Sequence, residues 1–174
     1  VLNSGEILTN GNLTAKKVES TGDITVVGKI SSNSLKSSGT LRTNEDLSIK
    51  GRFDNDGTVE TSKNVAVSGD INNTGKILAS GNLSGRNTVS AGVISSRNVN
   101  VDDLKNDGTL ETAEDVKVSG NIRNTGRIAS NGDLTGKDIA TSGTIASRNV
   151  KADNLSNDGV IIANGNINAK NVKN

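Results

Sequence analysis

The sequence predicts an all-β protein that folds as a single-stranded parallel β-helix, or β-solenoid, of about ten coils with 16–18 residues in each coil. Three observations predict this fold. A glycine recurs at that period along the whole chain, three columns of aliphatic residues keep step with it, and no segment has the i, i+3, i+4 spacing of a helix. Because like positions of successive coils lie about 4.8 Å apart, ten coils should give a rod of about 48 Å.

The recurring glycine marks the start of each repeat. A period of about 17 residues is too short for a helical hairpin or a propeller blade, and it is typical of solenoids in which each unit is one coil of strands. We expect the glycine at a tight corner, where it either takes a positive φ or lets two backbones approach closely. The column is Gly5, Gly22, Gly39, Gly57, Gly75, Gly92, Gly108, Gly126, Gly143 and Gly159.

Three aliphatic columns should form the core, and polar residues alternate with them as in strands that have one face inside. The first column is Ile7, Ile24, Leu41, Val59, Ile77, Ile94, Leu110, Ile128, Ile145 and Ile161. The second is Leu13, Ile30, Leu47, Val65, Leu83, Val99, Val116, Leu134, Val150 and Ile167. The third is Val18, Leu35, Phe53, Ile71, Leu104, Ile122, Ile139, Leu155 and Val172, with either Thr88 or Val89 at the fifth place.

A polar column stands two residues before each glycine, and we expect it to form a hydrogen-bonded ladder from coil to coil. Its members are Asn3, Ser20, Ser37, Asn55, Asn73, Ser90, Asn106, Asn124, Thr141, Asn157 and Asn174. A lone coil cannot offset the entropy of ordering its own backbone, so stability should belong to the stacked array.

Residues 1–174 should form one continuous β-helix segment, which we interpret as an internal fragment of a longer repeat array. Residues 57–107 and 108–158 are two blocks of three coils with 26 of 51 positions identical, which indicates duplication. Neither end has a capping segment, and open strand edges favour end-to-end stacking.

Composition excludes several function classes. The 20 basic and 19 acidic residues balance, so we expect no nucleic-acid partner. The absence of Cys and His excludes thiol and imidazole catalysis and the usual zinc ligands. A single aromatic residue argues against platforms that stack sugars or bases. No apolar run is long enough to cross a membrane.

Four sets of residues could be considered as sites, and each has a simpler interpretation. The Asn-Asp-Gly triplets at 55–57, 106–108 and 157–159 could bind calcium but are turn sequences. The carboxylates Asp102, Asp103 and Asp107, or Glu111, Glu114 and Asp115, could cleave glycans but lack the long loops that build a groove. Arg97 and Arg148 are equivalent surface charges, and the sequons at Asn12, Asn72, Asn82 and Asn154 are expected by chance. We therefore predict no catalytic, cofactor-binding or metal-binding residue, and no enzyme.

The repeat pattern Asn-x-Gly-x-Ile-x-Ala/Thr-x-Gly-Asn/Asp-Leu-x-Ala/Gly recurs in 3–15, 73–85, 124–136 and 157–169. It resembles the haemagglutinin repeats of filamentous haemagglutinin-like exoproteins, which include adhesins and contact-dependent growth inhibition effectors. The resemblance implies a right-handed β-helix and two-partner secretion through an outer-membrane transporter. It also implies a place on the bacterial surface or in the medium, with host or neighbouring cells as partners of the parent protein. The coils are somewhat shorter than the family's repeats, and no functional residues carry over.

The favoured function is a rigid stalk that projects an adhesive tip or a toxin from the cell. A lateral face that binds a surface, carbohydrate or ice is the alternative, with Leu8, Leu78, Val93, Val160 and Ile162 as exposed apolar candidates. A regular Thr array is missing from the outward positions of the first strand, which argues against ice. These positions are Leu8, Thr25, Arg42, Glu60, Leu78, Ser95, Glu111, Ala129, Ala146 and Ile162. A polysaccharide-acting enzyme is the least favoured alternative.

Overall fold

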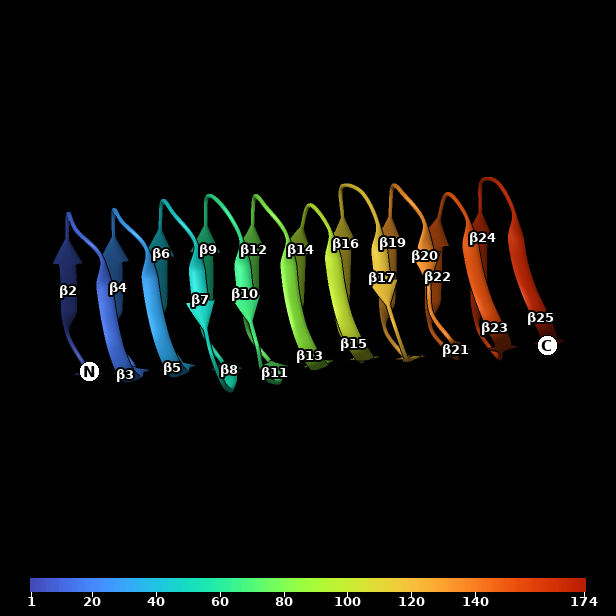
Figure 1. Cartoon of the computed structure of the whole chain (residues 1–174). Coiled ribbons are helices and arrows are strands. Elements are labelled where there is room, and N and C mark those ends of the chain that lie inside the picture. Colours follow the sequence, from blue (N-terminus) through green and yellow to red (C-terminus); the bar gives the residue numbers. More distant parts are fainter.

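The computed structural model describes all residues 1–174 and confirms the parallel β-helix. The chain winds from one end of a rod to the other, so that the two termini lie at opposite ends (Figure 1). All strand pairs are parallel, and there is no helix, hence none that could cross a membrane. Two sheets run the length of the rod, one of ten strands and one of fifteen.

The ten-stranded sheet contains the first strand of each coil and lies behind the other sheet in Figure 1. Its strands are β2 (Glu6–Thr9), β4 (Asp23–Val26), β6 (Thr40–Thr43), β9 (Thr58–Thr61), β12 (Lys76–Ala79), β14 (Val93–Ser96), β16 (Thr109–Thr112), β19 (Arg127–Ser130), β22 (Thr144–Ser147) and β24 (Val160–Ala163). Every strand has four residues, because each coil repeats the same two inward and two outward positions.

The fifteen-stranded sheet contains the rest of each coil. Its long strands are β3 (Leu13–Ser20), β5 (Ile30–Ser37), β13 (Leu83–Ser90), β15 (Val99–Asn106), β23 (Val150–Asn157) and β25 (Ile167–Lys173). In other coils the strand is broken into β7 (Leu47–Ile49) and β8 (Phe53–Asn55), β10 (Val65–Val67) and β11 (Ile71–Asn73), β17 (Val116–Val118) and β18 (Asn121–Asn124), or β20 (Leu134–Thr135) and β21 (Asp138–Thr141); β1 (Leu2–Asn3) precedes the first coil. Each of these four breaks contains a glycine, namely Gly51, Gly69, Gly120 and Gly136.

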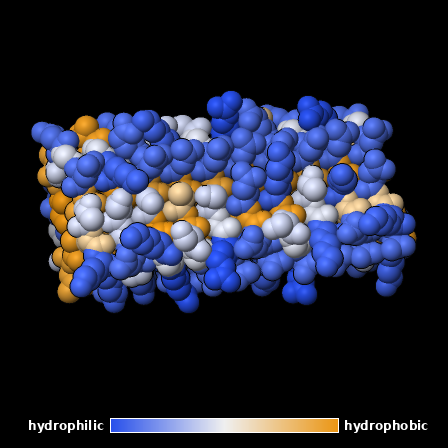
Figure 2. Space-filling view, in the orientation of Figure 1, coloured by the Kyte–Doolittle hydropathy of each residue, from blue (hydrophilic) through white to orange (hydrophobic).

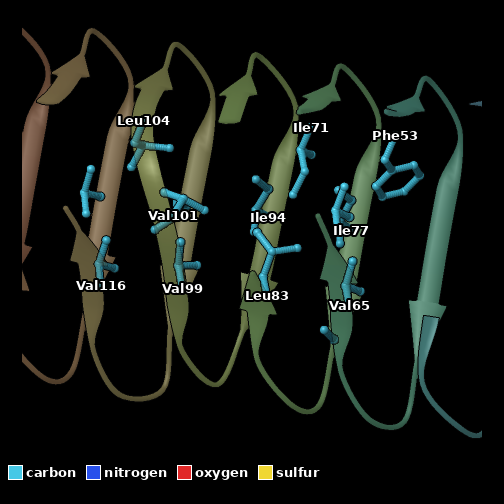
Figure 3. Packing of buried hydrophobic residues seen from close by; sticks show 14 of the residues in the cluster. Phe53, Val65, Ile71, Ile77, Leu83, Ile94, Val99, Val101, Leu104 and Val116 are labelled. Carbon is cyan, nitrogen blue, oxygen red and sulfur yellow. The ribbon is translucent and has the colours of Figure 1, made fainter. Parts of the chain in front are cut away.

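The three aliphatic columns are confirmed as continuous stacks. In the ten-stranded sheet Ile7 pairs with Ile24 and Ile24 with Leu41, and the register continues without a slip to Ile161. The other two columns keep the same register, and a cluster of 31 buried side chains fills the rod (Figure 3). Burial of these side chains is the main favourable contribution to folding.

The fifth place of the third column belongs to Thr88. Thr88 pairs with Ile71 on one side and Leu104 on the other and is only 1% exposed, whereas Val89 points outward. The hydroxyl of Thr88 has no hydrogen-bond partner. Nearby, the side chain of Ile71 occupies the space that a Cβ on Gly85 would need, so this glycine makes room for a core side chain.

The repeated glycine is required for close approach of backbones. No glycine in the chain has a positive φ, so the alternative of a left-handed corner is wrong. A Cβ on Gly22 would overlap the carbonyl oxygen of Gly5, and a Cβ on Gly39 would overlap that of Gly22. The same clash recurs at each later member of the column, because corners of successive coils stack directly on one another.

The polar column forms the expected ladder inside one corner. Asn55 donates its Nδ2 hydrogen to Oδ1 of Asn73 at 2.8 Å, and Asn73 donates to Oγ of Ser90 at 3.3 Å. The same amides also donate to backbone carbonyls of their own and the next corner, such as Gly57 O at 3.1 Å from Asn55. The ladder therefore links several neighbouring coils at a buried corner of the rod.

A second ladder lies at the corner before the second strand, and sequence reasoning missed it. The residue before each second-column aliphatic is Asn or Asp in every coil except the second, which has Lys29. In most coils its Oδ1 atom accepts the backbone N–H of the equivalent residue in the next coil, for example 2.8 Å from Asn98 to Asp115 and 2.9 Å from Asp115 to Asp133. Oδ1 of Asn82 and of Asp133 instead accepts from the side-chain amide of the next member. The signal was present as a second Asn/Asp column at the same period.

The end coils expose residues of the core columns. Val1, in register with Val18 of the third column, is 43% exposed at one end, and Ile167 and Val172 are 49% and 64% exposed at the other. Figure 2 shows hydrophobic residues gathered at the end that contains the N-terminus and in a broken strip along the middle of the flank in view, which is otherwise mostly hydrophilic. The core columns are buried in the middle of the rod and partly exposed in its end coils.

Candidate binding groove on the ten-stranded sheet

The outer face of the ten-stranded sheet contains a shallow hollow with a volume of about 1060 Å³. It crosses six consecutive strands, β6, β9, β12, β14, β16 and β19, so its long direction follows the rod axis. We call it the sheet groove. Sequence reasoning predicted no groove, because every coil is minimal and has no long loop.

Side-chain length creates the sheet groove. The outward positions Leu78 and Ser95 carry half-buried side chains, whereas the longer side chains of Arg42 and Glu60 stand at one end and that of Glu111 stands at the other. Outward positions of neighbouring coils lie about 4.8 Å apart, so short side chains between long ones leave a hollow that needs no loop. The hollow therefore results from the order of long and short side chains in one outward column of the ten-stranded sheet.

Ion pairs frame the sheet groove. Arg42 Nε lies 2.8 Å from Glu60 Oε2 at one end, and Arg127 Nε lies 3.9 Å from Glu111 Oε1 at the other. All four side chains are 40–55% exposed, so solvent screens these pairs and each adds little to stability. Their main effect is to fix the positions of donors and acceptors around the hollow.

Arg97, one of the predicted surface charges, lies in the wall of the sheet groove. Its Nε is 2.8 Å from Glu114 Oε1, and Asn98 donates to the other carboxylate oxygen at 2.9 Å. The hydrogen bond from Asn98 and then the pair with Arg97 hold the pKa of Glu114 below its ordinary value. Glu114 is thus kept ionised and bound within the wall.

Arg148 is equivalent to Arg97 in sequence but pairs differently. Its Nε is 2.9 Å from Asp133 Oδ1 in the preceding coil, whereas Arg97 reaches the following coil. The hydrogen bond to Asp133 raises the pKa of Arg148, and the same bond holds the pKa of Asp133 low. Arg148 does not line the sheet groove.

The first carboxylate set does not converge on one site. Asp102 Oδ1 accepts from Ser119 Oγ at 3.2 Å, and Asp103 Oδ1 accepts from the backbone N–H of Asn121 at 2.7 Å. Asp107 pairs with Lys105 at 2.9 Å. Each carboxylate is held by a different partner.

The second carboxylate set is divided between two places. Glu111 and Glu114 line the sheet groove with separate arginine partners, while Asp115 belongs to the second Asn/Asp ladder. The hydrogen bond from the backbone of Asp133 is the main reason that the pKa of Asp115 is lowered.

The Asn-Asp-Gly triplets form corners. Asn55 lies in the buried ladder, and Asp56 accepts a hydrogen bond from Thr74 Oγ1 at 2.7 Å. The equivalent Asp107 accepts from Thr125 Oγ1 at 2.7 Å. No group of three or more Asp, Glu, His or Cys side chains is placed to hold a metal ion.

The four sequon asparagines take part in bonds between coils. Asn12 Oδ1 accepts from the backbone of Lys29 at 2.8 Å, and Asn82 Oδ1 accepts from Asn98 Nδ2 at 3.1 Å. Two other sequon residues act as donors. Asn72 donates to Asp54 and Asn154 donates to Asp138.

The apolar candidates do not form one patch. Leu8 is 69% exposed at one end of the ten-stranded sheet, and Val160 and Ile162 are 52% and 54% exposed at the other. Leu78 and Val93 lie between them and are half-buried. A lateral apolar surface therefore does not run along this face.

Comparison with known proteins gave no match to any family model, any curated protein or any solved structure.

Proposed function

We propose that this chain is a rigid rod segment, a stalk in a large secreted bacterial exoprotein of the filamentous haemagglutinin type. In this role it projects an adhesive tip or a toxin from the cell, and it needs no catalytic site, cofactor or metal. The observation that carries the proposal is the uninterrupted register of the three core stacks, one in the ten-stranded sheet and two in the fifteen-stranded sheet. A slip in any stack would give a place to bend, and none occurs.

The use of the polar side chains supports a scaffold role. Asn, Asp, Ser and Thr side chains at the corners bond from one coil to the next, as in the pairs Asn55 to Asn73 and Asp115 to Asp133. Side chains committed to such bonds stiffen the stack and are not free for chemistry. The equivalence of residues 57–107 and 108–158 fits a function that depends on length.

Location and partners follow from the repeat resemblance. The chain would leave the cell through an outer-membrane transporter of two-partner secretion and stand on the cell surface or in the medium. Its parent protein would meet host or neighbouring cells. The exposed core residues at both ends, with their unpaired strand edges, support end-to-end stacking as a further association.

Surface exposure and length can be tested in cells that express the native protein. Protease treatment of intact cells should release peptides of residues 1–174 or destroy antibody binding to them. Removal of residues 57–107 should shorten the projection seen by electron microscopy by about 14 Å, because three coils are lost. Peptides that stay protected until the cells are lysed would overturn the proposed location and role.

A further inference from the structure

We propose that the sheet groove binds a neutral, linear oligosaccharide of β-(1→4)-linked hexopyranoses, laid along the rod axis. This inference does not depend on the stalk role. It rests on the shape of the sheet groove, the pairing of its charges and the side chains of its floor.

The shape of the sheet groove requires an extended occupant. The hollow crosses six strands, from β6 to β19, at right angles to the strand direction. Each coil adds about 4.8 Å along this path. An extended β-(1→4)-linked hexose chain advances by nearly the same distance per sugar, so each sugar would meet the equivalent positions of one coil. A curved, α-linked glucan lacks this match.

The charges of the sheet groove favour a neutral occupant. Its three arginines, Arg42, Arg97 and Arg127, pair with Glu60, Glu114 and Glu111, so the formal charge of this set is zero. A polyanion or polycation would have to compete with these pairs.

Hydroxyl groups can bind the framing ion pairs without breaking them. Arg42 and Arg97 pair through Nε, which leaves the terminal guanidinium N–H donors for a ligand. Their carboxylate partners still have lone pairs that can accept from sugar hydroxyls.

The floor of the sheet groove offers both kinds of contact that a sugar ring uses. Leu78 gives an apolar surface for the C–H face of a ring, and the hydroxyls of Ser80 and Ser95 can exchange hydrogen bonds with it. The sheet groove has no aromatic side chain for stacking, so binding should be weak, with a Kd of about 1 mM.

A peptide strand is the less favoured occupant. The backbone of β9, β12, β14 and β16 is paired on both sides within the sheet, so this face presents no free edge for strand addition. A bound peptide would lose water from its own N–H and C=O groups without gaining backbone partners.

The test uses the 174-residue chain and backbone amide NMR shifts during titration with cellohexaose. Maltohexaose controls for chain shape, and hexagalacturonate controls for charge. The variant Ser95→Lys places a long side chain on the floor of the sheet groove. Its matched control is Ala146→Lys, at the equivalent outward position one block later, which lies outside the groove. Circular dichroism of both variants checks that the fold is kept.

We expect cellohexaose to shift the amides of Glu60, Leu78, Ser95 and Glu111, and Ser95→Lys to weaken binding about tenfold while Ala146→Lys leaves it unchanged. Equal weakening by both variants, or shifts confined to other surfaces, would overturn the site. Equal or tighter binding of maltohexaose or hexagalacturonate would overturn the ligand class, as would the absence of any shift at about 10 mM cellohexaose, tenfold above the expected Kd.

Discussion

The side-chain amide of Asn106 donates to Oδ1 of Asn124, 2.9 Å away in the next coil, while Oδ1 of Asn106 itself accepts no hydrogen bond. The preceding member of this column is Ser90, whose short side chain does not reach it. The same situation holds for Asn55, which follows Ser37 and also has an unpartnered Oδ1. The buried ladder is thus interrupted wherever an asparagine follows a serine.

Ser90→Asn should stabilise the protein by about 1 kcal/mol, because the new amide can donate to Oδ1 of Asn106. The column accepts asparagine at equivalent places such as Asn73, so the longer side chain fits. Urea denaturation of both proteins measures the change in the free energy of unfolding. Ser20→Asn is the control, because the next member, Ser37, has no orphaned amide oxygen, and an equal gain from both variants would contradict the explanation.

Gly85→Ala should destabilise the protein by about 1–3 kcal/mol, because the new Cβ would collide with Cδ1 of Ile71. Ile71→Val removes that Cδ1 atom and alone should cost about 0.5–1.5 kcal/mol. The double variant should then be more stable than the sum of the single effects predicts. A double-mutant cycle from thermal or urea unfolding measures this coupling.

Gly75→Ala is the matched contrast for Gly85→Ala. Its Cβ would meet the backbone oxygen of Gly57, which no side-chain change can remove. Ile71→Val should therefore give no relief at Gly75. Relief at both glycines would show that the proposed local collision is not the cause.

Ile128→Asp should unfold much of the rod or cost about 4 kcal/mol or more. Ile128 is fully buried between Leu110 and Ile145, so a carboxylate there would be desolvated without a partner. Ala129→Asp is the control on the same strand. It puts a carboxylate on the exposed outer face, beside Glu111 and on the same face as Arg127, and should change stability by less than about 1 kcal/mol. Similar losses in both variants would contradict the stacked core.

Stability should fall in acid. The pKa values of Asp107, Glu114, Asp115 and Asp133 are lowered in the folded protein, chiefly by hydrogen bonds from Lys105, Asn98, the Asp133 backbone and Arg148 respectively. A carboxyl group with a lowered folded pKa adds stability above its unfolded pKa of about 4, and this stability is lost as pH falls through the folded value. Urea unfolding at pH 7, 4 and 2 measures it.

Asp115→Asn identifies one source of the acid sensitivity. The amide oxygen can still accept the backbone N–H of Asp133, but the side chain no longer titrates. The variant should therefore lose less stability between pH 7 and pH 2 than the original chain. If the variant loses as much stability between pH 7 and pH 2 as the original chain does, Asp115 is not among the groups responsible for the acid sensitivity.

Deletion of residues 57–107 should give a folded rod that is shorter by about 14 Å in small-angle scattering. The junction restores Asn55, Asp56 and a glycine followed by threonine, since Gly108 takes the place of Gly57. Deletion of residues 57–99 is the control, because it removes a fraction of a coil and shifts the columns out of phase. A folded control, or an unfolded first variant, would contradict whole-coil stacking.

The sequence was sufficient to predict the core stacks, because side-chain burial in a β-helix repeats with the coil and is visible as columns. It left the fifth place of the third column open between Thr88 and Val89, since both fit a period count and only the corner geometry assigns Thr88 to the interior. It also left two reasons open for the glycine column, namely a positive φ or a close approach of two backbones. The structure shows the close approach, which depends on how tightly the corners of successive coils stack.

The sheet groove could not be predicted from the repeat pattern. Its floor depends on the lengths of the outward side chains, since Leu78 and Ser95 are shorter than Arg42 and Glu111. It also depends on which of the long side chains form ion pairs with each other. By contrast, the second Asn/Asp ladder was visible as a column before each second-strand aliphatic.

The direction of the backbone hydrogen bonds determines how the rod responds to mechanical load. Every bond of the two sheets joins one coil to the next, so the bonds lie along the long axis. A pull on the ends loads the outermost ladder one bond after another, and each coil that detaches releases about 50 Å of extended chain. Tension therefore unravels the molecule from an end in regular steps, while bending and compression meet the whole packed cross-section.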